Sequence, residues 1–431
     1  MKLFSTNNPN KLVDLKEAVL NAFPEDRGLY WPTEIPLLRS DFLSRLAEFS
    51  FNDIAFEVSN ALIQGTIPEK DLIDIIENSI RFPAPVVGLS DDLNILELFH
   101  GPTMAFKDFG ARFMAQLMSY FTKGSDRKTT ILVATSGDTG GAVASGFFNA
   151  PGIEVIILYP SGKISPLQEQ QLTTWGNNIK AVEVNGVFDD CQALVKQAFL
   201  DKDLKSRYTF SSANSINIAR LIPQSFYYFE AYKQLDRNKS NIFVVPSGNF
   251  GNLTAGLLAQ KMGLDIHSFV AAINSNKTFL DYIDSGVYEA RPSVPTVSNA
   301  MDVGDPSNFP RLLNVSGSTW NMVKSNIRSY SFTDSQTIEA IKAVYNTYHY
   351  TIDPHGAVGY LAYLSDKEIS PYANYTVLET AHPGKFSEIV NKAIPEKIIV
   401  PEALRSFMDK PKEAFNIQNN YKEFKSLLMH L

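Results

Sequence analysis

Strands followed by polar turns and then by helices recur along most of the chain. The clearest cases are the strand patterns at 129–135 and 241–246, each of which leads through a glycine-rich turn into a pattern with helical spacing. Continuous apolar runs that alternate with helices are typical of parallel strands with helices on both faces of the sheet. The recurrence therefore predicts an α/β fold of doubly wound, mostly parallel sheets.

Composition excludes several classes of protein. The 431 residues are 44% apolar and 20% charged, which is ordinary for a globular chain with room for two or three domains. The net charge of −7 weighs against nucleic acid as a partner. The single cysteine, Cys191, lies in a helical pattern and favours a buried thiol, and the six histidines lack metal-binding spacing, so we expect no metal. No signal peptide and no membrane span is recognisable, and we expect a cytoplasmic protein without a membrane partner.

The first 92 residues differ from the rest because they lack the strand–helix alternation. Amphipathic patterns over 12–23, 41–51 and 69–80 are separated by prolines and predict helices. We expect 1–92 to form a mainly helical extension that covers the core.

Lys107 occupies an unusual position for a lysine. The mostly apolar run 95–99 passes through the turn HGPT into a helix that begins at Lys107. The positive end of the helix dipole and the neighbouring Phe106 and Phe109 would both lower the pKa of its amine. A lysine held partly neutral suits Schiff-base chemistry. A lysine that reaches toward solvent beside Asp108 is the alternative.

Two glycine-rich turns have the composition of anion sites. The turn 136–141 precedes a helix of small residues, so free N–H groups can converge there, although a tight turn with close packing explains the same pattern. The turn 247–252 has two glycines and two asparagines, and such a nest binds a phosphate monoester without a lysine. Neither turn has the spacing of a dinucleotide fingerprint or a P-loop.

Polar side chains also stand at the entrance of an aromatic helix. The residues that precede or begin this helix include Asn214, Ser215 and Arg220. The planar guanidinium of Arg220 is suited to bind phosphate. A surface arginine beside a helix cap is the alternative. Ligands of open α/β sheets lie at the carboxyl ends of the strands, so these turns and Thr380, which follows the run 375–379, can converge on one crevice. An amine and a separate phosphate nest are what pyridoxal 5′-phosphate (PLP) requires.

The segment HGPTMAFKDFG resembles the cofactor-lysine motif of the threonine synthases, a PLP-dependent family of the tryptophan-synthase-β-like fold (fold type II). The similarity continues in order through GLYWP, RFPAP, TSGDTGG, GKISPLQE, SANSINIAR, PSGNFGNLTAG, SNAMD and TAHPGKF, and so covers the whole chain. This resemblance implies two α/β domains with the PLP site between them. We expect a large domain of 93–128 and 241–431, and a smaller one of 129–240.

The resemblance also implies roles for particular residues. Lys107 would bind PLP covalently and move protons, Thr380 would bond to the pyridine nitrogen, and Asp138 would face the phenolic oxygen. The cofactor phosphate would be bound by Gly248, Asn249, Phe250, Gly251 and Asn252. The substrate carboxylate would be bound by Thr135, Ser136 and Thr139. The substrate phosphate would be bound by Asn214, Ser215 and Arg220. Much of the wider superfamily has Asn in place of Asp138, so the protonation state of this carboxyl is open.

The implied reaction converts O-phospho-L-homoserine and water to L-threonine and phosphate by γ-elimination and β-hydration, the last step of threonine biosynthesis. This makes the chain a carbon–oxygen lyase, and we expect a monomer or a weak homodimer. A serine or threonine dehydratase of the same fold is the nearest alternative, but it has no use for a second phosphate site. A PLP sensor without catalysis would lack the lysine or the substrate phosphate set, and a nucleotide-binding module would need a P-loop or GxGxxG motif.

Overall fold

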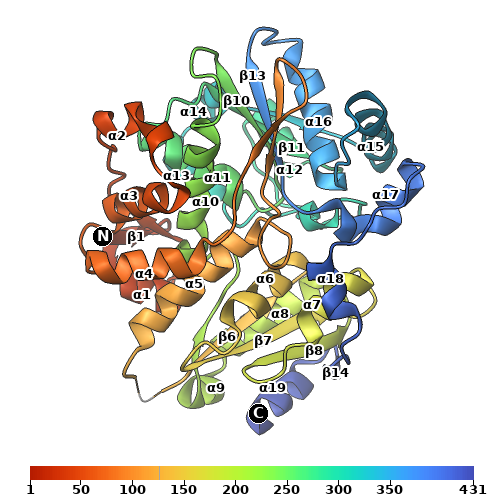
Figure 1. The fold of residues 1–431 in the computed structure, drawn as a ribbon. Helices are drawn as coiled ribbons and strands as arrows, with labels where there is room; N and C mark the ends of the chain where they lie inside the picture. Colours follow the sequence, from red (N-terminus) through yellow and green to blue (C-terminus); the bar gives the residue numbers. More distant parts are fainter. Residues whose placement is uncertain (126) are drawn as a thin grey trace.

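The computed structural model describes residues 1–125 and 127–431, and its larger sheet occupies the upper half of Figure 1. The strand order is β12-β11-β10-β13-β5-β4, and all neighbours are parallel except β4 and β5. The strands are β4 (Val86–Gly88), β5 (Leu93–Glu97), β10 (Asn241–Pro246), β11 (Ser268–Ile273), β12 (Ile327–Ser331) and β13 (Asn374–Glu379). Every residue of β10, β11 and β13 is buried, as expected for central strands covered on both faces.

A second sheet lies in the lower half of Figure 1 and is parallel throughout. Its order is β14-β8-β7-β6-β9. The strands are β6 (Thr129–Ala134), β7 (Ile153–Pro160), β8 (Ile179–Asn185), β9 (Thr209–Ser211) and β14 (Phe415–Gln418). The two parallel sheets confirm the fold class predicted from the alternation of strands and helices.

Helices cover the sheets and connect their strands. Those that follow strands of the smaller sheet, or lie beside it, are α6 (Asp138–Phe147), α7 (Pro166–Thr173), α8 (Phe188–Leu200) and α9 (Lys202–Arg207). Those of the other half are α5 (Lys107–Thr122), α10 (Ile218–Tyr232), α11 (Gly251–Lys261), α12 (Thr278–Ser285), α13 (Phe309–Val315), α14 (Trp320–Asn326), α15 (Asp334–Tyr348), α16 (Pro354–Lys367) and α17 (Ser387–Ala393). Short 3-10 turns are η2 (Asn299–Met301) and η3 (Pro383–Phe386).

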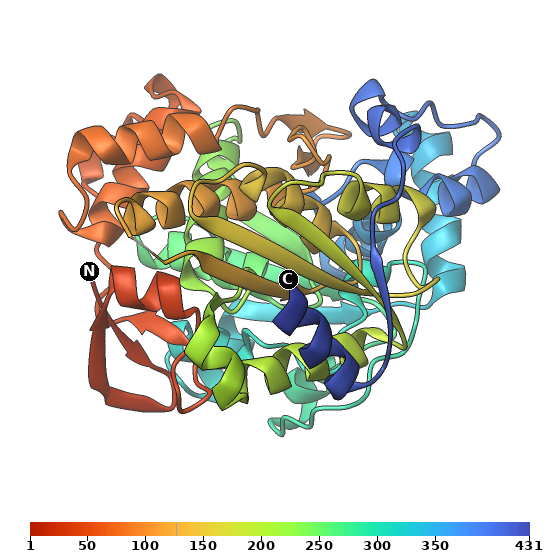
Figure 2. The same cartoon turned by 90° about the horizontal axis from the view of Figure 1, so that it is seen from below.

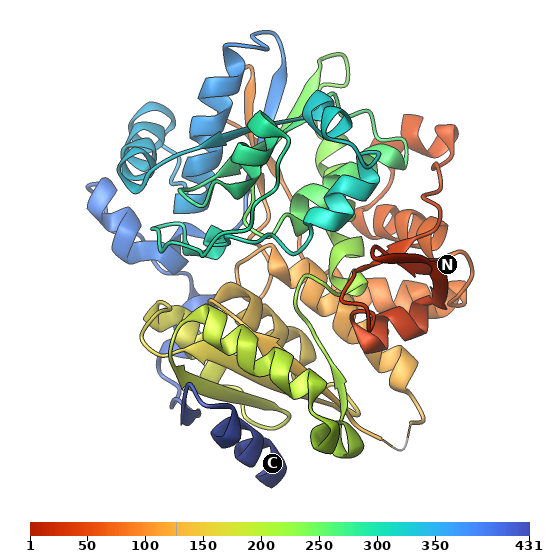
Figure 3. The same ribbon diagram turned by 180° about the vertical axis from the view of Figure 1, so that it is seen from behind.

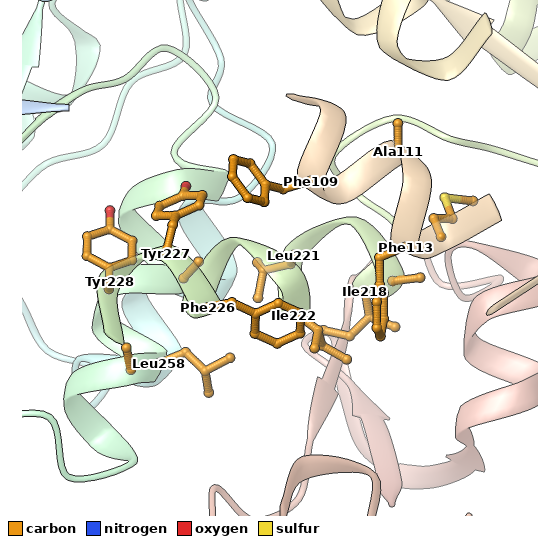
Figure 4. Close-up of a cluster of buried hydrophobic side chains, with 14 of the residues drawn as sticks. Phe109, Ala111, Phe113, Ile218, Leu221, Ile222, Phe226, Tyr227, Tyr228 and Leu258 are labelled. Carbon is orange, nitrogen blue, oxygen red and sulfur yellow. The ribbon is translucent and has the colours of Figure 1, made fainter. Parts of the chain in front are cut away.

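The core that fixes the site lies between α5 and α10. Figure 4 shows Phe109 of α5 next to Tyr227 of α10, with ring centroids 5.4 Å apart. Phe113 meets Phe226 in the same edge-to-face manner at 5.7 Å. All fifteen residues of α10 are buried, so this helix has no solvent face. Aromatic packing of this kind holds the first turn of α5, which begins at Lys107, in a fixed position.

The N-terminal extension contains an antiparallel sheet that the sequence patterns did not predict. Its helices are α1 (Leu15–Asn21), α2 (Ser40–Ser44), η1 (Leu46–Glu48), α3 (Phe51–Ile63) and α4 (Glu69–Ser79), and its strands, in the order β2-β1-β3, are β1 (Lys2–Ser5), β2 (Asn8–Asp14) and β3 (Tyr30–Pro32). The helix expected over 69–80 is confirmed, whereas those expected over 12–23 and 41–51 are shorter than predicted or interrupted. In β2 only Val13 is buried, so this strand lacks the apolar alternation by which strands are recognised.

The last thirty residues pack on the smaller sheet. They form α18 (Glu402–Met408), β14 and α19 (Tyr421–His430), and Figure 2 shows α19 lying under that sheet. Lys412 forms ion pairs of 2.7 Å with both Glu169 and Glu183. We therefore propose the predicted domain boundaries with residues 402–431 moved from the large to the smaller domain. A short, mostly exposed edge strand such as β14 joins a sheet through main-chain hydrogen bonds, which leave little trace in the sequence. Within the described residues, no helix combines the length and the apolar character needed to cross a membrane.

Candidate active site

The predicted turns follow the carboxyl ends of strands from both sheets and meet between them. Lys385, beyond β13, places its Nζ 2.8 Å from Oδ1 of Asp138, which begins α6 after β6. On the other side, Nδ2 of Asn249, beyond β10, donates to Oγ of Ser215 over 2.6 Å. These two contacts join the halves of the molecule, and in Figure 3 the teal segment that contains η2 runs along the same junction.

The turn that precedes Lys107 is braced by Asp108. Its Oδ2 accepts from the N–H of Thr103 at 2.8 Å, and its Oδ1 accepts from the hydroxyl of the same threonine at 2.7 Å. Burial raises the pKa of Asp108, and the hydrogen bonds from Thr103 oppose this effect. In the described part of the chain no ion pair joins Asp108 to Lys107. Asp108 therefore shapes the turn and does not pair with the amine of Lys107.

The amine of Lys107 is suited to react as a neutral nucleophile. Its pKa is lowered to about 8, mainly by burial and with smaller contributions from the cations Arg220 and Lys385, while the charge of Asp138 opposes the shift. The side chain is half-buried, and no described residue accepts a hydrogen bond from Nζ. An unpaired lysine with a depressed pKa at a helix start is consistent with the Schiff-base chemistry predicted for it.

The nest 247–252 leaves main-chain donors unused. Phe250 has a left-handed backbone (φ 57°) and caps α11, and no described residue accepts a hydrogen bond from the N–H groups of 248–251. An added Cβ at Gly248 would lie 2.6 Å from Cα of Met301, so only glycine fits there. Oγ of Ser247 donates to Oδ1 of Asn252 at 2.7 Å and holds the turn. Free N–H groups at a helix start form a cradle for a phosphate.

Asn249 ties this nest to its surroundings with its side chain and carbonyl. Besides bonding Ser215, it accepts from the N–H of Ser307 at 2.5 Å and from Nδ2 of Asn308 at 3.1 Å. The segment after SNAMD thus packs over the nest. What remains of Asn249 for a ligand is its main-chain N–H.

The three residues predicted for a carboxylate do not have equal freedom. The hydroxyl of Thr135 accepts from the N–H groups of Gly137 and Gly140 at 3.0 and 2.9 Å, and it donates to the carbonyl of Gly137. Ser136 and Thr139 are half-buried at the start of α6, and their hydroxyls bond to no other described residue. Thr135 holds the turn, which leaves Ser136, Thr139 and the helix N-terminus to meet an anion.

Arg220 is buried, and only its Nη1 donates to another described residue. The residue is 3% exposed, its Nη1 donates to the carbonyl of Ala213 at 2.5 Å, and its Nε has no partner among the described residues. Burial lowers its pKa to about 10, and Asp108 opposes this shift. Nε packs against Gly110 of α5, where an added Cβ would lie 2.8 Å away, one turn beyond Lys107. Arg220 is therefore a cation of the interior beside the lysine, not a surface arginine.

Asn214 and Thr380 complete the set of predicted residues. Nδ2 of Asn214 donates to the carbonyl of Ala134, which places Asn214 at the end of β6. Thr380 is 6% exposed and lies next to the lysine turn, because its carbonyl accepts from the N–H of Phe106 at 2.8 Å. Its hydroxyl bonds to no other described residue and is free for a ligand.

Three polar residues at the junction were not predicted. Lys385 is buried and pairs with Asp138, to which Nε2 of Gln168 also donates at 3.0 Å. Nε2 of Gln171 donates to the carbonyl of Thr103 at 3.3 Å. All three lie within or beside the segments GKISPLQE and TAHPGKF, but spacing alone gives them no chemical role.

These features fit PLP. An unpaired amine (Lys107), a nest of unused N–H groups and a free hydroxyl (Thr380) match the aldehyde, phosphate and pyridine nitrogen of that cofactor. The described residues contain no group of three or more His, Cys, Asp or Glu side chains placed to hold a metal ion.

Comparison with known proteins identifies the family of the chain. The family model "Pyridoxal-phosphate dependent enzyme" matches residues 87–380, and the models for the threonine synthase N terminus and C-terminal part match 2–80 and 356–428. Threonine synthase of Haemophilus influenzae is 42% identical over 432 residues, covering 100% of both chains. The crystal structure of threonine synthase from Escherichia coli has a TM-score of 0.93 and 39% identity, with 100% of both chains covered. PLP-bound threonine synthase from Brucella melitensis has a TM-score of 0.93 and 33% identity over 100% of this chain and 99% of that one. The chain therefore belongs to the threonine synthase family of PLP-dependent enzymes.

Proposed function

We propose that the chain converts O-phospho-L-homoserine and water to L-threonine and phosphate. The observation that carries this proposal is Arg220, a buried guanidinium with an unused donor beside Lys107. The cofactor phosphate is accounted for by the nest 247–252, so Arg220 is available for a second phosphate. A dehydratase that acts on a hydroxy-amino acid has no such requirement.

Each predicted residue then receives a role in the proposal. Lys107 would hold PLP covalently, with the cofactor phosphate on the N–H groups of Gly248, Asn249, Phe250, Gly251 and Asn252, the pyridine nitrogen at Thr380 and the phenolic oxygen at Asp138. When bound, PLP supplies the electron sink that makes protons on the substrate carbons acidic. Ser136, Thr139 and the start of α6 would bind the substrate carboxylate, with Thr135 shaping that turn. Asn214, Ser215 and Arg220 would bind the substrate phosphate.

Lys107 would also act as the base and acid of the reaction. Its pKa of about 8 lets the amine accept and return a proton near neutral pH, at Cα and then at Cβ of the substrate. Arg220 would stabilise the dianion that leaves Cγ by a charge-assisted contact. Water then adds at Cβ, and the buried contacts across the junction limit its access to other positions.

The test is a direct assay of both products. The full chain with PLP is incubated with O-phospho-L-homoserine, and phosphate and threonine are measured, with L-serine and L-threonine as parallel substrates. The proposal expects phosphate and threonine in equal amounts and little keto acid from the parallel substrates. Faster release of keto acid and ammonia from L-serine would instead establish a dehydratase. We retain a cytoplasmic location and a monomer or weak homodimer as predictions.

A further inference from the structure

A buried ion pair stands at the centre of the junction between the two sheets. Nζ of Lys385 is 2.8 Å from Oδ1 of Asp138, and the side chains are 0% and 4% exposed. Lys385 comes from η3, after β13 of the larger sheet, and Asp138 begins α6, after β6 of the smaller sheet. Nζ also donates to the carbonyl of Thr103 at 2.9 Å, in the turn that leads to Lys107. One ammonium thus links the cofactor lysine's turn to the opposite half of the molecule.

The donors to Asp138 converge on one of its two oxygens. Lys385 and Nε2 of Gln168 both contact Oδ1, and no described residue donates to Oδ2. Burial alone would raise the pKa of Asp138, but Lys385 and then Lys107 outweigh it and hold the pKa well below its usual range. The carboxyl is therefore ionised, with one oxygen fixed and the other left for a ligand.

An ionised Asp138 beside an anionic phenolic oxygen is unfavourable unless a cation is close to both. Lys385 is such a cation, because its buried ammonium is already in contact with the carboxylate. The ion pair has no net charge. It can therefore take the place of the neutral Asn side chain that much of the wider superfamily has at this position. Removal of either partner would leave the other as an uncompensated buried charge.

We propose that Lys385 is a positioning residue of this site, which holds Asp138 ionised and correctly placed against the phenolic oxygen of PLP. This inference rests on the proposed placement of the cofactor. The positive charge of Lys385 would compensate the negative charge of an aspartate beside the phenolic oxygen. Lys385 would act on the cofactor through Asp138. The same contact would also fix the distance between the two halves of the molecule.

The test is a double-mutant cycle with Lys385→Met, Asp138→Asn and the variant that carries both changes. The full chain is titrated with PLP, and the pH midpoint of the visible absorbance of the bound cofactor is measured. Loss of the cation in Lys385→Met should raise this midpoint by on the order of one pH unit, and loss of the anion in Asp138→Asn should lower it. In the double variant the two shifts should largely cancel, and PLP affinity should recover relative to Lys385→Met.

Two further variants keep the test decisive. Lys425→Met removes a lysine that pairs with Asp201 and Asp203 at the start of α9, and it should leave the midpoint unchanged. Lys385→Arg keeps the positive charge, so its pH midpoint should stay close to that of the wild type. If Lys385→Met does not fold, a folded double variant with a near-normal midpoint supports the pair, and a double variant that also fails to fold overturns the proposal. Midpoint shifts of the same sign in the two single variants, or losses of PLP affinity that simply add in the double variant, would also overturn it.

These readouts do not depend on the reaction catalysed. A chain that binds PLP and shows opposite midpoint shifts, but forms no threonine, would refute the proposed function and leave the role of Lys385 intact.

Discussion

The N–H of Phe106 donates a hydrogen bond of 2.8 Å to the carbonyl oxygen of Thr380. Two residues that are 274 positions apart thereby place Lys107 and the free hydroxyl of Thr380 on adjacent chain segments. A second contact, from the N–H of His382 to the carbonyl of Met104 at 3.0 Å, repeats the link one step further on. The amine and the hydroxyl therefore share one rigid main-chain frame, which fixes their separation better than flexible side chains could.

Lys107→Ala should abolish covalent attachment of PLP and the activity, and leave the fold intact. The lysine makes no ion pair within the described residues, so its removal leaves no buried partner unsatisfied. Reduction of the wild-type complex with borohydride, followed by digestion and mass spectrometry, should place the label on Lys107. Lys163→Ala, at an exposed lysine, is the control. Label on any other lysine would contradict the assignment.

The rate at which the chain without cofactor attaches PLP should rise with pH through about 8 and then level off. Burial lowers the pKa of Lys107 to about 8 from an ordinary value of 10.5, so the neutral amine is already dominant above pH 8. Between these values the folded chain binds fewer protons than the unfolded chain, so the contribution of this group to stability increases with pH. Stopped-flow absorbance from pH 6 to 11 measures the midpoint. A midpoint near 10.5 would show that the amine is solvated.

Arg220→Lys should lower kcat and raise KM for the phosphorylated substrate while PLP affinity is unchanged. A lysine keeps the charge but not the fork, and the lost charge-assisted hydrogen bond costs about 1.5–3 kcal/mol. Steady-state kinetics and PLP titration separate the two effects. Arg112→Lys is a matched control, because Arg112 bonds the carbonyls of Asn78 and Ser79 outside the site. A fall in PLP affinity for Arg220→Lys would assign Arg220 to the cofactor phosphate or to the core.

Thr380→Asp should retain PLP and slow phosphate release more than hydrogen exchange at Cα. A neutral hydroxyl leaves the pyridine nitrogen largely unprotonated, whereas a carboxylate favours the protonated nitrogen and a stronger electron sink. A stronger sink retains the electron density that must move toward Cγ to expel phosphate. Phosphate release and deuterium uptake at Cα are measured on the same preparation. Equal losses in both would mean general damage, and no change in either would mean that Thr380 does not reach the ring.

Arg311→Lys should destabilise the chain and raise KM for the phosphorylated substrate. This fully buried guanidinium donates to four acceptors, which are Oδ1 of Asn308 and the carbonyls of Tyr30, Ser215 and Ile216. An ammonium has three donors on one atom and cannot reach groups spread over three segments, and each acceptor left unpaired costs about 1–3 kcal/mol. Urea unfolding and substrate kinetics test both parts. Unchanged KM with lowered stability would limit Arg311 to a structural role.

The pattern along the chain was sufficient to predict the parallel sheets, because buried strands such as β10 are almost entirely apolar and leave a strong local signal. It failed for β2 and β14, whose residues are mostly exposed and whose pairing depends on main-chain hydrogen bonds, with the neighbouring β1 for β2 and with the distant β8 for β14. Asp14 illustrates the difficulty, since it ends β2 and also caps α1, and only the pairing of β2 with β1 decides where the helix starts.

For the site, the sequence by itself determined which groups are present: an amine at a helix start, glycine-rich turns after strands, and an arginine at the entrance of a buried helix. These signals are local, because a turn and the first residues of a helix depend mainly on their own neighbours. Only the tertiary structure decided that Lys385 meets Asp138, and that Thr135 is used to hold its own turn. The physical reason is that a buried charge is stabilised by whichever opposite charge the fold brings within contact distance, and Lys385 and Asp138 lie 247 residues apart in the chain.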